Sequence, residues 1–205
     1  MSAVVPAAPR LVLADRVLGR SIPLDVVLVV TGAALTALLA QVAVPLYPVP
    51  ITGQTLAVLL VGATLGAARG AISLALYAVL GIVGLPVFSD YAGGVDVILG
   101  PTGGYIIGFI VSAALVGWLS ERAWERQVLK ALATFAAGTL VVFAVGLPWL
   151  AVALGLDLMQ TLNGGLFPFL IGGAIKAVIA AGLLPLAWWG ADRLEKRRAA
   201  DSDAA

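Results

Sequence analysis

Lys176 is the one basic residue of this chain that lies inside a hydrophobic run, the stretch from 167 to 181. A charged amine near the middle of a membrane helix costs about 2.5 to 3.5 kcal/mol on insertion scales, so its surroundings must compensate it. An anionic group on a small amphipathic ligand would do so in a mostly apolar cavity. We therefore predict that Lys176 contacts a ligand.

Two structural explanations of Lys176 are weakened by its position. At least about 13 Å of helix separates it from the ends of its hydrophobic segment, which is a long reach for a side chain that snorkels to the interface. No Asp or Glu lies deep inside another hydrophobic segment to form an ion pair with it. A role in helix pairing stays open as an alternative.

Catalytic groups are scarce in the rest of the chain. It contains no Cys and no His, which excludes thiolate and imidazole metal sites and a His general base. Ser73 and Ser112 lie in hydrophobic segments without the G-x-S-x-G setting of a hydrolase, and a Ser–Lys pair with Lys176 is only formally possible. No Walker A sequence occurs, so ATP-driven transport would need other subunits. We expect a protein that is not an enzyme and has no cofactor or metal.

The composition indicates a membrane protein with several spans. Of the 205 residues 61% are hydrophobic and only 11% are charged, with a mean hydropathy of +1.08. Soluble domains carry about 25% charged residues. With about 20 residues for each span, the chain has room for six helices and no separate soluble domain. We expect an all-α membrane protein in contact with lipid, and no nucleic-acid partner.

Six hydrophobic segments can be placed along the chain, with short connections between them. The second and third are separated only by the hinge from Gly66 to Gly70, which contains Arg69. A single span there would have about 35 residues, far more than a bilayer needs. A count of five spans is the alternative. The expected segments are 23–45, 51–67, 70–85, 103–119, 129–154 and 167–189.

The charged residues fit one orientation of these six segments. Ten of the twelve basic residues lie before the first segment, after the last, or in the second and fourth connections, and an eleventh, Lys130, lies at the very start of the fifth segment beside the fourth connection. The other connections contain Asp90, Asp96 and Asp157 and no Lys or Arg. Because basic residues gather on the cytoplasmic side, both termini are expected there. The expected parts are an N-terminal tail 1–22, a membrane domain 23–190 and a C-terminal tail 191–205.

Several short motifs, in order along the chain, closely resemble the BioY family, the biotin-binding S-components of energy-coupling factor (ECF) transporters. They are Pro48-Val49-Pro50-Ile51-Thr52-Gly53-Gln54-Thr55, Gly81-Ile82-Val83-Gly84-Leu85-Pro86-Val87-Phe88, Gly93-Gly94, Gly100-Pro101-Thr102-Gly103-Gly104-Tyr105, and Pro168-Phe169 through Lys176. The resemblance covers about residues 24 to 189. It implies a bundle of six membrane helices, S-component-like, that captures biotin from outside. It also implies a membrane T-component and cytoplasmic ATPases as partners, in the cytoplasmic membrane of a bacterium.

The resemblance also assigns roles to individual residues. Lys176 matches the lysine of the family's site, so contact with biotin carries over. The other matching positions from which we expect contacts are Gln54, Gly103, Gly104, Tyr105 and Phe169. Gln54 has a helix-start hydrogen bond as its alternative role, and Tyr105 a place at the membrane interface.

The first hydrophobic segment carries a stripe of small residues. S-components generally contact the T-component through such a stripe on the first helix, and Ala33 and Ala37 have that spacing. Packing inside the chain is the alternative for both.

The chain departs from the family pattern beside Lys176. Where the family usually has Pro-Gly-Asp, this chain has Ile171-Gly172-Gly173, so the acid three residues before the lysine is missing. We expect Asp90 or Asp96 to accept the ureido hydrogen bonds instead, and the alternative is that both are simply solvated. The departure keeps open an S-component for another vitamin, and a membrane scaffold without a ligand is the second alternative.

Overall fold

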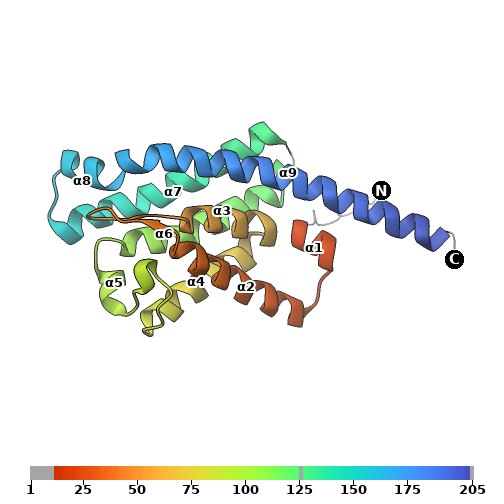
Figure 1. Ribbon diagram of the computed structural model, residues 1–205, viewed down its shortest axis with the longest axis horizontal. Coiled ribbons are helices and arrows are strands. Elements are labelled where there is room, and N and C mark those ends of the chain that lie inside the picture. The colour runs from red at the N-terminus through yellow and green to blue at the C-terminus, as the bar shows by residue number, and fades with distance from the viewer. Residues whose placement is uncertain (1–11, 125–126, 204–205) are drawn as a thin grey trace, which may run out of the picture.

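The computed structural model describes residues 12–124 and 127–203 (Figure 1). Outside this part of the chain lie residues 1–11 and 204–205 of the two expected tails, with Arg10, and also Arg126; the side chains of residues 194–203 are outside it as well. The described chain is mostly helical, which confirms the predicted class. The helices are α1 (Leu13–Leu18), α2 (Ile22–Ala40), α3 (Gln54–Leu65), α4 (Ala67–Ile82), α5 (Val95–Leu99), α6 (Gly103–Ser120), α7 (Val128–Leu154), α8 (Leu158–Gly165) and α9 (Phe167–Asp203), with a 3-10 turn η1 (Ser89–Tyr91).

A small hairpin interrupts the helices between α2 and α3. Its strands β1 (Ala43–Val44) and β2 (Ile51–Thr52) pair in antiparallel fashion, with Ala43 opposite Thr52. The sequence analysis predicted no strand here. The hairpin places Thr52 directly before α3, beside α9.

Local signals set where several helices begin and end. The Ser21 hydroxyl accepts a hydrogen bond from the backbone N–H of Leu24 and caps α2. Gly66 separates α3 from α4 and has a φ of 86°, a backbone conformation that favours glycine. The backbone N–H of Ala67, which begins α4, donates to Glu121 Oε1 at 2.8 Å. The predicted hinge between the second and third segments is therefore confirmed at Gly66.

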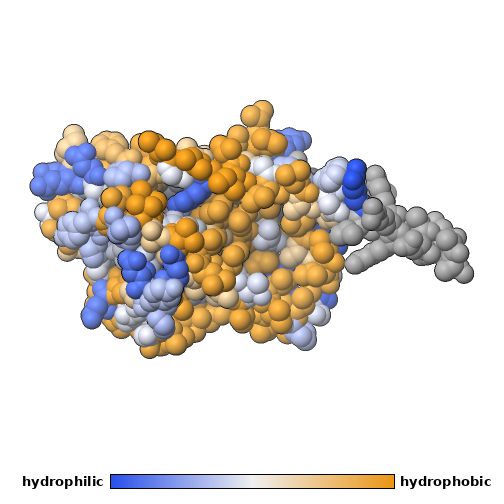
Figure 2. Space-filling model, viewed as in Figure 1, coloured by the Kyte–Doolittle hydropathy of each residue, from blue (hydrophilic) through white to orange (hydrophobic). Residues whose placement is uncertain are grey.

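Four stretches of the described chain are long and apolar enough to cross a membrane: α2, α6, α7 and residues 158–193. The predicted second and third segments correspond to α3 and α4, which have only 12 and 16 residues. At 1.5 Å per residue they are about 18 and 24 Å long, less than the roughly 30 Å of a hydrocarbon core. Hydrophobic surface covers the middle of the molecule, and hydrophilic residues gather at the end that holds α5 and α8 (Figure 2).

Helix α6 is the centre of the bundle and packs against α3, α4 and α7. Glycines allow the backbones to approach closely. A side chain at Gly62 would lie 2.7 Å from the carbonyl oxygen of Ala113, and one at Gly117 would lie 2.3 Å from the backbone nitrogen of Ala67. Helix α2 covers α4, and α9 covers α7 and α3.

A cluster of ion pairs lies at the end of the bundle that holds α1. Arg69 and Arg20 each donate to the buried carboxylate of Asp15 at 2.7 Å, and Arg69 also donates to Asp25 at 2.8 Å. Burial opposes ionisation of Asp15, but the hydrogen bonds from Arg20 and Arg69 outweigh it and lower the pKa of this carboxyl below its ordinary value. The sequence analysis did not predict α1, which the cluster fastens to α4.

Candidate ligand-binding site

A cavity of about 240 Å³ lies at the opposite end of the bundle, close to α5 and the start of α6. The hairpin and its neighbouring residues, the loop between α4 and α5, and helices α3, α6, α7 and α9 all contribute to its wall. The lining is mostly apolar, with a few polar groups. Its residues are Val49, Pro50, Thr52, Gln54, Thr55, Phe88, Ser89, Asp90, Ala92, Val97, Thr102, Tyr105, Ile106, Phe109, Thr139, Val142, Phe143, Phe169 and Lys176.

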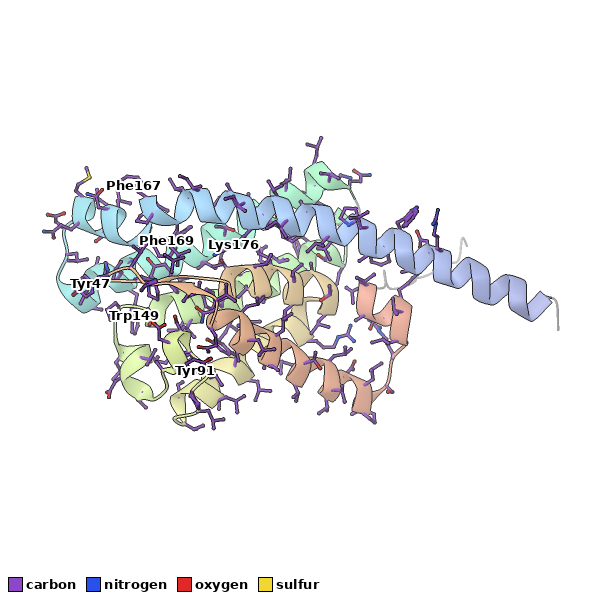
Figure 3. The ribbon with its side chains drawn as sticks, viewed as in Figure 1. Tyr47, Tyr91, Trp149, Phe167, Phe169 and Lys176 are labelled. Carbon is purple, nitrogen blue, oxygen red and sulfur yellow. The ribbon has the colours of Figure 1, made fainter. Side chains whose placement is uncertain are left out.

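Lys176 lies in the wall formed by α9 and is half-buried. Its Nζ donates hydrogen bonds to the backbone carbonyl of Thr52 and, at 3.0 Å, to Thr55 Oγ1. In Figure 3 its side chain lies on the side of α9 that faces the bundle. Among the described residues no carboxylate lies within ion-pair distance of this amine. The positive charge therefore has two neutral partners and no counter-ion.

A chain of hydrogen bonds fixes the groups that hold Lys176. Thr52 Oγ1 donates to Gln54 Oε1 at 2.6 Å, and Gln54 Nε2 donates to the Tyr77 hydroxyl at 2.5 Å. Gln54 is 7% exposed and is the first residue of α3. Both ends of its amide are held by the protein, so Gln54 lines the cavity and also orders the residue that binds Lys176.

Aromatic rings form the wall beside Lys176. Tyr105 stacks with Phe169 at a centroid distance of 6.3 Å, and Phe143 meets both rings edge-on. The Tyr105 hydroxyl donates to the backbone carbonyl of Gly165 at 3.0 Å. Tyr105 is 5% exposed, so it is a buried wall of the cavity and not an interfacial aromatic. Such a wall suits a flat or aliphatic ligand group.

The loop between α4 and α5 supplies polar groups opposite α9. Phe88 is buried, whereas Asp90 is exposed and lines the cavity. Ser89 also lines the cavity, and its buried hydroxyl has no hydrogen-bond partner among the residues that the structure describes. This loop therefore offers a carboxylate and a free hydroxyl to a ligand.

Three of the expected contacts lie outside the cavity. Asp96 is exposed in α5, where Val97 takes the position that lines the cavity. A side chain at Gly103 would lie 1.7 Å from the carbonyl oxygen of Ile98, and one at Gly104 would lie 2.2 Å from Trp149 Cβ. These two glycines permit close packing of α6 and do not form the cavity wall.

The small residues of α2 that were expected to contact a T-component lie in or against the core of the bundle. Ala33 is 2% exposed and belongs to the core of the bundle, and Ala37 is partly buried against the same core. A side chain at the neighbouring Gly32 would lie 2.7 Å from Ser73 Oγ of α4. Packing inside the chain, the alternative interpretation, accounts for the burial of Ala33 and for part of the surface of Ala37, and the contact with a T-component stays a prediction.

Several polar residues of the cavity were not expected from the sequence. Thr52 and Thr55 are in the motif that begins at Pro48, but nothing in that motif indicates that they hold Lys176. Thr139 is a polar residue inside a predicted span, and this was a signal that could have been used. Ser89 adjoins Asp90 in a loop and gave no signal of its own.

Comparisons with known proteins give a consistent result. The sequence model of the BioY family matches residues 15–193. A protein of Rhizobium etli named biotin transporter BioY is 37% identical in an alignment of 167 positions that covers 77% of this chain and 89% of that protein. One of the same name from Thermotoga maritima is 38% identical over 142 residues, 69% of this chain and 82% of that protein. A solved structure, described as the S-component for biotin from an ECF-type ABC transporter, has a TM-score of 0.68 and 26% identity, covering 84% of this chain and 90% of that one.

Proposed function

The chain belongs to the BioY family, and we propose from this that it captures biotin at the membrane as the S-component of an ECF-type transporter. It is a transport protein and not an enzyme. The observation that carries the proposal is the cavity in which Lys176 has neutral partners and, among the described residues, no counter-ion. Biotin has a carboxylate at one end and a ureido ring at the other, so it can supply the missing negative charge.

The valerate carboxylate of biotin is the partner that we assign to Lys176. A charge-assisted hydrogen bond in an apolar cavity is stronger than one in water, because the local dielectric constant is low. Tyr105, Phe143 and Phe169 then enclose the apolar part of the ligand. Gln54 acts mainly by holding Thr52, which in turn holds Lys176.

The ureido ring is the partner that we assign to the loop between α4 and α5. The acid expected three residues before Lys176 is Gly173 here, and a side chain added at Gly173 would meet nothing within 4 Å. Asp90 lines the cavity and can accept from the ureido N–H groups, and the free hydroxyl of Ser89 can donate to the ureido oxygen. Asp96 lies outside the cavity and takes no part in this assignment.

We also propose the finer topology of the expected six spans, with α3 and α4 as two short ones. The distribution of the basic residues supports cytoplasmic positions for both termini, and in this orientation the cavity opens toward the outside of the expected bacterial cell. A T-component and cytoplasmic ATPases would supply the energy, because the sequence contains no Walker A motif. The contact with a T-component through Ala33 and Ala37 stays a prediction; in the free chain Ala33 is 2% exposed and Ala37 is partly buried.

Equilibrium binding of a panel of vitamins to the purified chain in detergent or nanodiscs tests this function. We expect saturable binding of biotin and no competition from other vitamins. Binding of another vitamin in place of biotin would support an S-component of different specificity. Failure of every vitamin to bind the folded chain would support the scaffold alternative.

A further inference from the structure

Gln41, the residue directly after α2, is hydrogen-bonded through both ends of its amide to the loop between α4 and α5. Its Nε2 donates to the carbonyl oxygen of Phe88 at 3.0 Å, and its Oε1 accepts from the backbone N–H of Tyr91 at 3.0 Å. The same Nε2 also donates to the carbonyl oxygen of Ala37 at 3.2 Å. Gln41 is not among the described residues that line the cavity. Its amide thus spans the two residues, Ser89 and Asp90, that do line it.

The turn that Gln41 holds has an unusual backbone. Asp90 and Tyr91 both have a φ of 56°, in the left-handed region that residues with a side chain rarely adopt. Asp tolerates this region better than most residues, but Tyr has no such tendency. The Tyr91 ring is largely exposed, and its position in Figure 3 is on the side of the molecule away from α9. The packing of its ring therefore does not hold this conformation, and its backbone N–H is held by the Gln41 side chain.

Phe88 fixes the start of the same turn. Its ring is 2% exposed and fills a notch at Gly81, where an added side chain would lie 2.0 Å from Phe88 Cζ. It also meets Tyr77 edge-on at a centroid distance of 5.4 Å. The turn is thus anchored at Phe88 by packing and is closed by backbone hydrogen bonds from Phe88 N–H to the Ala92 carbonyl at 3.0 Å and from Ala92 N–H to the Ser89 carbonyl at 3.2 Å. Gln41 adds the hydrogen bond to the Tyr91 N–H between them. Because Asp90 is exposed and also lines the cavity, this turn lies between the cavity and solvent.

We propose that Gln41 is a positioning residue of the binding site. Its amide holds the turn from Phe88 to Tyr91 so that Ser89 and Asp90 face the cavity, and it thereby limits how fast a bound ligand leaves. The second part rests on the proposed function, because it takes the ligand to be biotin. The first part concerns the free protein and stands independently.

Hydrogen exchange on the ligand-free protein tests the first part. Gln41→Met keeps the length of the side chain but removes both hydrogen bonds to the loop, so exchange in residues 86–94 should rise about tenfold, with other segments unchanged. Gln41→Glu keeps an acceptor for Tyr91 and loses the donor to Phe88, so its effect should be intermediate. Gln160→Met, at the start of α8, is the control. Unchanged exchange in both Gln41 variants would overturn the proposal, whether or not the chain binds biotin.

Biotin kinetics test the second part. In Gln41→Met the dissociation rate should rise about tenfold while the association rate changes little, since two hydrogen bonds of ordinary strength are lost. If Gln41 acts by placing Asp90, the double variant with Asp90→Ala should bind no more weakly than Asp90→Ala alone. Fully additive losses, or a dissociation rate equal to that of the wild type, would show that Gln41 does not act through this turn.

Discussion

The two ends of this helical bundle differ in whether a buried charge has a partner of opposite charge. At the end that holds α1, the carboxylate of Asp15 is shared by Arg20 and Arg69, and Arg69 also pairs with Asp25. At the other end Lys176 faces a cavity with only a carbonyl and a hydroxyl as partners. The first arrangement is complete without a ligand and serves to fasten α1. In the second, no carboxylate among the described residues lies within ion-pair distance of Lys176, and this difference marks Lys176 as a binding group.

The largest effect in this comparison should come from removing the unpaired charge. Lys176→Met should weaken biotin binding at least about 100-fold, because the carboxylate loses its charge-assisted partner. The variant should fold as well as the wild type or better, since a half-buried charge is removed. Lys130→Met, at an exposed position in the first turn of α7, is the matched control and should bind normally. Unfolding of Lys176→Met would assign Lys176 a structural role instead.

The opposite result, a loss of stability with unchanged biotin affinity, is expected at the end that holds the ion pairs of Asp15. Arg69→Met leaves the buried carboxylate of Asp15 with Arg20 as its remaining partner, so the free energy of unfolding should fall by about 2 kcal/mol. Thermal unfolding in detergent measures this loss. Biotin affinity of the folded variant should stay within about twofold of the wild type, because the two sites share no residues. A large loss of affinity would mean that the two ends are coupled.

A smaller loss of biotin affinity is expected from a substitution in the loop that faces Lys176. Asp90→Ala should weaken biotin binding about tenfold, the loss expected for one or two hydrogen bonds to a charged acceptor. Asp96→Ala removes a carboxylate of the same connection that lies outside the cavity, and its affinity should be unchanged. Titration calorimetry of both variants makes the comparison. Equal affinities for Asp90→Ala and the wild type would contradict the assignment of the ureido ring to this loop.

The sequence predicted those features that depend on one unusual residue or on residues adjacent in the chain. A charge inside a hydrophobic run identified Lys176, and the hinge at Gly66 separated two helices. The partners of Lys176 could not be predicted, since Thr52 reaches it through a backbone carbonyl that the hairpin places beside α9. Backbone acceptors have no signature in a sequence.

The choice between Asp90 and Asp96 shows a second limit. Both lie in the same acidic connection, and only the turn of the loop and the rotation of α5 place Asp90 at the cavity and Asp96 in solvent. The hydrogen bonds of Gln41 to the loop could not be predicted for the same reason, because they join residues that are 47 and 50 positions apart. Ala33 and Ala37 show that small residues at regular spacing predict close packing but not the partner that packs there.

Biotin amide tests whether Lys176 binds the carboxylate of the ligand. The amide keeps the ring and the chain of biotin but has no charge. We predict that the wild type binds biotin about 100-fold more tightly than the amide, and that Lys176→Met binds the two equally weakly. If Lys176→Met still prefers biotin by the same factor as the wild type, another group binds the carboxylate and the account is wrong.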